Sequence, residues 1–84
     1  MSEEEKSYKD FKNLLGYMGI EIFLAIDKGA KNYETIQLFS GLSFDCIKGR
    51  IPVLIDLELI KKVFEEHFLT EKGINFKNYL EKGN

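Results

Sequence analysis

The sequence predicts a small, mostly helical α+β domain. Apolar residues recur every three or four positions over most of the chain, as they do on one face of a helix. Residues 59–69 instead read as two short strands joined by a tight turn. With 84 residues the chain is too short for two domains, while 44 % hydrophobic residues and eleven aromatics suffice for one core. A domain this short buries only about 60 % of its unfolded surface, so we expect association with a partner or a second copy.

The first two helices are expected near residues 4–15 and 17–28. Apolar residues at positions 8, 11, 15 and 18 form one stripe of a helix, and Gly16 and Gly19 interrupt or bend the run. A glycine is also a natural C-terminal stop, and Gly29 is expected to end the second helix. Within the single domain, residues 1–84, the first sixteen residues read as a helical extension that serves dimerisation.

A short helix near residues 33–40 should follow, with Ile36 and Phe39 facing inward. Gly41 then supplies the positive φ that a tight turn needs. The next helix, near 43–57, begins at a Ser43 N-cap. Its apolar face is a clean helical series: Ile47, Ile51, Leu54 and Ile55.

Pro52 lies inside this predicted helix and removes the amide that would bond the carbonyl of Lys48. Either the helix kinks there or it consists of two pieces. After it, the two strands near 59–69 are expected to turn at Glu65 and Glu66. Thr70 caps a last helix near 71–81. Its apolar members are Ile74, Phe76, Tyr79 and Leu80.

The charge of the chain is uneven. The net charge is −2, which argues mildly against a nucleic-acid binder. Residues 28–62, however, carry six basic and four acidic side chains, a net charge of +2, whereas the rest carries six basic and ten acidic. Lysines in the positive segment can neutralise phosphates.

One cysteine, Cys46, excludes an internal disulfide and fits a reducing compartment. The acidic start, residues 2–5, is unlike a secretory signal, and no stretch approaches 18 apolar residues. We therefore expect a cytoplasmic protein without a membrane contact.

Three stretches together carry a resemblance to a known family: "IEIFLAIDKGAKNYETIQLFSGLS", "IKGRIPVLIDLELIKK" and "HFLTEKGINFKNYL". In their order over residues 20–80, the chain resembles archaeal or bacterial (or archaeal viral) transcription regulators of the MarR/ArsR-like winged helix-turn-helix superfamily. The resemblance implies three helices, a short two-stranded wing and a last helix. Glu58 departs from the pattern, because such sequences usually place a Gly at the end of the recognition helix.

The resemblance implies sequence-specific binding of double-stranded DNA by a small homodimeric transcription regulator with no enzymatic activity. Outward and N-terminal residues of a recognition helix reach base edges, and lysines near the wing reach phosphates. The candidate DNA-binding residues are Phe44, Asp45, Lys48, Gly49, Lys61, Lys62 and Lys31. The alternative is a protein–protein interaction module that docks through its acidic wing, and Pro52 and the net charge favour it.

Flanking helices often join the two copies in such proteins. The candidate dimer residues are Tyr8, Phe11, Leu15, Met18, Phe76, Tyr79 and Leu80. The other reading of this apolar stripe is that the first helix folds over the back of its own domain. Cys46 and His67 have no evident catalytic or metal-binding companions, so we expect packing or surface roles for them and no cofactor or metal.

Overall fold

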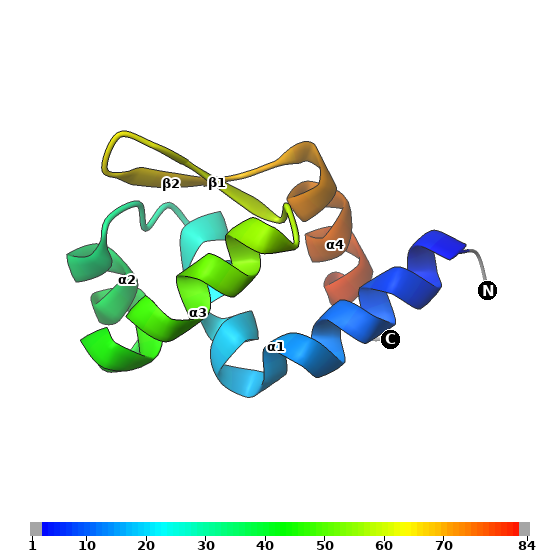
Figure 1. Ribbon diagram of the computed structural model, residues 1–84, viewed down its shortest axis with the longest axis horizontal. Helices are drawn as coiled ribbons and strands as arrows, with labels where there is room; N and C mark the ends of the chain where they lie inside the picture. Colours follow the sequence, from blue (N-terminus) through cyan, green and yellow to red (C-terminus); the bar gives the residue numbers. More distant parts are fainter. Residues whose placement is uncertain (1–2, 83–84) are drawn as a thin grey trace.

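The computed structural model describes residues 3–82, so the outermost residues of the predicted domain 1–84 lie outside the described range. The prediction of a mostly helical α+β domain with a two-stranded antiparallel sheet is confirmed. Figure 1 shows the hairpin running above α2 and α3. α4 and the first half of α1 lie at the end of the molecule opposite α2. The elements are α1 (Glu3–Asp27), α2 (Tyr33–Ser40), α3 (Phe44–Asp56), β1 (Ile60–Val63), β2 (Glu66–Leu69) and α4 (Glu71–Glu81).

α1 is divided at Gly16, which has φ 65° and ψ −173°. This combination is essentially open only to glycine, because a Cβ atom would clash with the backbone. The two helices expected near 4–15 and 17–28 therefore correspond to the two halves of α1. Gly19 is buried and leaves the second half uninterrupted.

An aromatic cluster holds the two halves of α1 against α4. The ring of Phe76, on α4, is fully buried. Its centroid lies 5.7 Å from that of Tyr8 and 6.0 Å from that of Phe11, on the first half of α1. It also lies 5.3 Å from that of Phe23, on the second half. Such aromatic pairs add about 0.5–1.5 kcal/mol each beyond the area they bury.

The cluster corrects the expected dimer interface. Four of the seven residues assigned to it are buried inside their own chain: Tyr8, Leu15, Phe76 and Tyr79. The apolar stripe of the first helix therefore covers α4, as in the reading in which it folds over its own domain. Phe11 and Leu80 are half-buried against the same core. Met18 alone among the seven is exposed, at 44 %.

The buried phenol of Tyr8 donates a hydrogen bond to the carboxylate of Glu4, one turn earlier. Burial, together with this hydrogen bond and the negative charge of Glu4, raises the pKa of Tyr8 to about 12. The phenol therefore stays protonated at neutral pH. Its hydroxyl group has a hydrogen-bond partner while its ring packs in the core.

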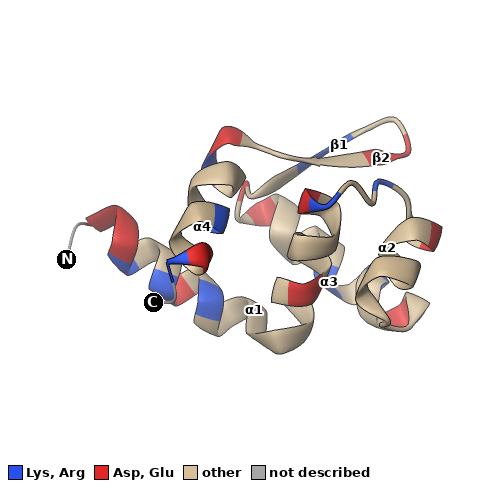
Figure 2. Cartoon of the chain, turned by 180° about the vertical axis from the view of Figure 1, so that it is seen from behind, with Lys and Arg blue, Asp and Glu red and all other residues tan. Residues whose placement is uncertain are grey.

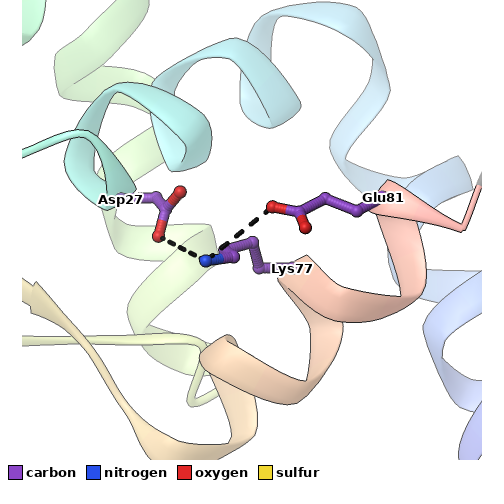
Figure 3. A network of polar contacts seen from close by, with 3 residues as sticks. All are labelled: Asp27, Lys77 and Glu81. Atoms are coloured by element: carbon purple, nitrogen blue, oxygen red, sulfur yellow. Dashed lines mark ion pairs between the residues drawn. The ribbon is translucent and has the colours of Figure 1, made fainter.

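Lys77, on α4, links α4 to the C-terminal end of α1. Its Nζ atom lies 3.5 Å from a carboxylate oxygen of Asp27 and 3.7 Å from one of Glu81 (Figure 3). Partly exposed ion pairs of this kind contribute about 0.2–1 kcal/mol each. The apolar core supplies most of the attachment between α1 and α4.

The hairpin turns one residue earlier than the sequence suggests. Val63 pairs with Glu66, so the two loop residues are Phe64 and Glu65 rather than Glu65 and Glu66. Phe64 has φ 58°. Because Glu65 does not share the positive φ, the loop is a type II′ turn, whose twist matches that of the strands. A bulky residue is uncommon at positive φ, so the sequence pattern places Phe64 in a strand. The predicted turn was therefore one residue too late.

Phe39, which was expected to face inward, is 50 % exposed. Ile74, one of the apolar members of the last helix, is 49 % exposed. On α2, Ile36 is fully buried and Tyr33 packs against the core on one side of it. Phe39 lies on the other side of Ile36. On α4, Ile74 projects away from the face that carries Phe76.

Replacing Gly16 with Ala should lower the free energy of unfolding by about 1–3 kcal/mol, because Ala is strained at this φ and ψ. Gly49→Ala is a matched control. Apart from the backbone next to the glycine itself, a Cβ atom would meet nothing within 4 Å at either position, but Gly49 lies inside α3 with helical geometry. Gly49→Ala should therefore raise stability by about 0.5–1 kcal/mol. Urea denaturation measures both, and an unchanged midpoint for Gly16→Ala would contradict the strained bend.

Candidate nucleic-acid interface

α2 and α3 are joined by three residues, 41–43. Gly41 has φ 74° and ψ 9°, a left-handed conformation that ends α2 and reverses the chain. Ser43 then caps α3, because its hydroxyl accepts a hydrogen bond of 3.2 Å from the amide of Cys46. The short turn fixes the direction in which α3 leaves α2.

α3 has one buried face and one exposed face. Three residues of the predicted apolar face, Ile47, Ile51 and Leu54, are buried, each at most 2 % exposed. The fourth, Ile55, is instead 36 % exposed. As the periodicity predicts, five residues of the other face are exposed: Phe44, Asp45, Lys48, Gly49 and Pro52. Four of them are candidate DNA-binding residues, and their contact with DNA stays a prediction.

α3 is one helix, which excludes the alternative that Pro52 divides it into two pieces. The helix runs from Phe44 to Asp56 through Pro52. Because proline has no amide hydrogen, the carbonyl of Lys48 lacks its usual partner in the helix. Pro52 and Lys48 are both on the exposed face, where water can satisfy that carbonyl.

A chain of ring contacts connects α3, α2 and the hairpin. The centroid of Tyr33, at the start of α2, lies 5.2 Å from that of Phe44 and 5.7 Å from that of His67 on β2. His67 is buried, and its amide donates to the carbonyl of Lys31 at 2.8 Å. Its Nδ1 lies 2.7 Å from the same oxygen and therefore carries the hydrogen. His67 thus has a packing role and ties β2 to the loop before α2.

Two of the candidate lysines flank one aromatic ring on the outer face of the hairpin. The Nζ atom of Lys31 lies 4.4 Å from the centroid of Phe68. Lys61 stands directly opposite Phe68 in the ladder, and opposite residues project from the same face of a sheet. Lys62 is exposed on the alternate face. Figure 2 shows basic residues on β1 and on the loop before α2, and acidic residues at the hairpin tip.

The hairpin tip carries an exposed aromatic residue that the sequence reasoning missed. Phe64 is 91 % exposed and Val63 is 45 % exposed, and both are followed by the exposed carboxylates of Glu65 and Glu66. The signal that could have revealed Phe64 is the spacing of the strands. If Ile60 and Leu69 are taken as the paired inward residues, the two-residue loop falls at Phe64 and Glu65.

Cys46 joins the first turn of α3 to α1. It is half-buried, and its Sγ atom lies 3.0 Å from the Sδ atom of Met18. This contact supports the packing role expected for Cys46. Over residues 3–82, no three side chains among His, Cys, Asp and Glu are grouped so that they could hold a metal ion.

No protein-family model matches the chain, and no curated protein matches it either. Among the helices described for residues 3–82, none has the length and apolar character needed to cross a membrane.

Glu58, in the loop after α3, should be replaceable by Gly with a gain in stability. It has φ 62°, a left-handed conformation that disfavours side chains with a Cβ by about 1–2 kcal/mol. Since Gly also gains entropy in the unfolded chain, the net increase in unfolding free energy should be about 0.5–1 kcal/mol. The matched control is Glu34→Gly, in the first turn of α2, which should lower stability by up to about 1 kcal/mol. Equal losses for both variants in thermal or urea denaturation would contradict the strain at Glu58.

Proposed function

We propose that the chain is a winged helix-turn-helix domain of the MarR/ArsR-like type that binds double-stranded DNA as a small transcription regulator. In this proposal α2 and α3 are the helix-turn-helix, α3 is the recognition helix and the β1–β2 hairpin is the wing. The proposal assigns no enzymatic activity to the chain. The observation that carries it is the exposed outer face of α3, which follows a three-residue turn and is followed at once by a hairpin.

The first half of α3 has the chemistry to contact bases. A helix that enters the major groove does so with its N-terminal and outward residues, which here include Phe44, Asp45 and Lys48. A lysine can donate to the acceptor atoms of guanine, an aspartate can accept from the amino group of cytosine, and an aromatic ring can touch the methyl group of thymine. Gly49 presents no side chain there and lets a backbone or a base edge approach closely.

The lysines of the wing and of the loop before α2 supply contacts of a different kind. Lys31 and Lys61 flank the ring of Phe68, and Lys62 is exposed on the other face of the hairpin. Their ammonium groups can neutralise phosphates, which adds affinity without sequence preference. A local net charge of +2 over residues 28–62 is modest, so we expect one copy to bind weakly. Two linked copies bind much more strongly, because the second contact becomes intramolecular.

The second candidate function is docking on another protein through the wing tip. The exposed ring of Phe64 beside Glu65 and Glu66 favours it, because an aromatic anchor with acidic neighbours suits an apolar pocket with a basic rim. The same carboxylates would repel a phosphate backbone. The two candidates therefore make opposite use of the hairpin tip.

Substitutions on α3 and on the wing should separate base contacts from phosphate contacts. Lys61→Ala or Lys62→Ala should weaken binding about equally for all duplexes and reduce the salt slope by roughly 1 per lost phosphate contact. Lys48→Ala or Phe44→Ala should instead change the preference among sequences, by about 1–3 kcal/mol per lost base contact. Fluorescence anisotropy at two salt concentrations measures these effects.

Lys9→Ala is the control for these substitutions. Lys9 is exposed on the first half of α1, which lies at the end of the molecule opposite α2 and the wing tip (Figure 1). It should leave the affinity and the salt slope unchanged. If all four variants behave like Lys9→Ala, the assigned DNA surface is wrong.

Reversing the charge at the wing tip distinguishes the two candidate functions. The double variant Glu65→Lys, Glu66→Lys should strengthen non-specific binding to duplex DNA, because the native carboxylates repel the backbone. Glu3→Lys, Glu5→Lys on the first turn of α1 is a control with the same change in net charge. The DNA proposal fails if the native protein has no duplex affinity at low salt and the wing-tip variant gains none. The protein-docking function would then take its place.

A further inference from the structure

Pro52 is an unfavourable residue for its place in α3. It lies in the interior of the helix, and its side chain is exposed rather than part of the core. A proline there removes one hydrogen bond from the helix and destabilises it. Departures from local preference that the core does not require are typical of functional sites. Pro52 lies on the face of α3 that is assigned to DNA, so its effect on that face is the relevant one.

The effect of Pro52 is a free backbone acceptor on the same face. In a regular helix the carbonyl of Lys48 accepts the amide hydrogen of residue 52, and proline has none. This carbonyl belongs to the peptide link between Lys48 and Gly49, one turn before Pro52, and all three residues are exposed. Gly49 has no side chain to cover the link, so a base edge can approach it closely.

We propose that the carbonyl oxygen of Lys48 reads one base of the bound DNA by accepting a hydrogen bond from its amino group. The inference rests on the proposed function, in which α3 enters the major groove. The amino groups of adenine and cytosine are the hydrogen-bond donors that bases present there, whereas guanine and thymine present acceptors. A carbonyl at this position therefore selects adenine or cytosine. Opposite guanine or thymine it would be buried without a partner.

This contact differs from the side-chain contacts assigned to α3. Lys48 would donate to guanine through its ammonium group and accept from adenine or cytosine through its peptide group. Asp45 also offers an acceptor, but its carboxylate stands at the end of a rotatable side chain. The carbonyl is held in one direction by the helix, so its hydrogen bond requires no side-chain ordering.

Deletion of amino groups from the DNA, compared between the native chain and Pro52→Ala, tests the inference. A preferred duplex is first selected from a randomised pool with the native chain. Each adenine is then replaced by purine and each cytosine by pyrimidinone, which lack the amino group. At one position the native chain should lose about tenfold in affinity, because a buried acceptor loses its partner. Pro52→Ala should lose little there, since the amide of alanine already occupies the carbonyl of Lys48.

Lys48→Ala and Asp45→Ala are the controls, because both variants keep the free carbonyl. Each should retain the loss of about tenfold at that position, although each loses the preference that its own side chain confers. If Asp45→Ala abolishes the loss, the amino group is read by the carboxylate and the inference is wrong. In the DNA-free protein, Pro52→Ala should raise the midpoint of urea denaturation, because α3 regains a hydrogen bond. A lowered midpoint would contradict a free carbonyl.

Two further results overturn the inference while the proposed function stands. One is an equal response of the native chain and Pro52→Ala to every amino deletion. The other is a change in the response of Pro52→Ala at all positions together, which would assign Pro52 to the shape of the helix. A native chain without duplex affinity at low salt instead overturns the proposed function, and this inference with it.

Discussion

The burial of one ring, that of Phe76, determines how the rest of the chain is arranged. Phe76 contacts Tyr8 and Phe11 before the bend in α1 and Phe23 after it. A straight helix could not bring both of its halves onto one ring of α4, so the aromatic cluster requires the break at Gly16. The second half of α1 is then free to pack on α2, α3 and β2. One helix thus serves two packing surfaces, and the outside of its bend is left exposed.

Local patterns in the sequence predicted the elements well. Caps at Ser43 and Thr70, together with glycines at 16, 29 and 41, mark helix boundaries through short-range chemistry that depends little on the rest of the fold. The turn of the hairpin was displaced by one residue, because Phe64 occupies a conformation that its side chain disfavours. Such an exception to local preference is readable only from the pairing of the strands.

Burial was harder to predict than secondary structure. Periodicity shows which residues of a helix share a face, but it does not show what lies opposite that face. Tyr8 and Leu15 have the pattern of an uncovered stripe only as long as the position of α4 is unknown. For the short α2, Ile36 and Phe39 suit an inward face equally well by spacing, and the neighbouring elements decide between them. On α3 the apolar series is longer, and it identified the buried Ile47, Ile51 and Leu54 correctly, whereas Ile55 at its end is exposed.

The bend of α1 and the first turn of α3 are in direct contact, since Met18 touches Cys46. Met18 lies two residues after Gly16, and Cys46 follows Phe44 and Asp45 at the start of α3. The first turn of α3 is thus held by α1 through Met18 and by α2 through the contact between the rings of Tyr33 and Phe44. The orientation of the helix proposed to read DNA therefore depends on the bend in α1 as well as on the short turn that precedes α3.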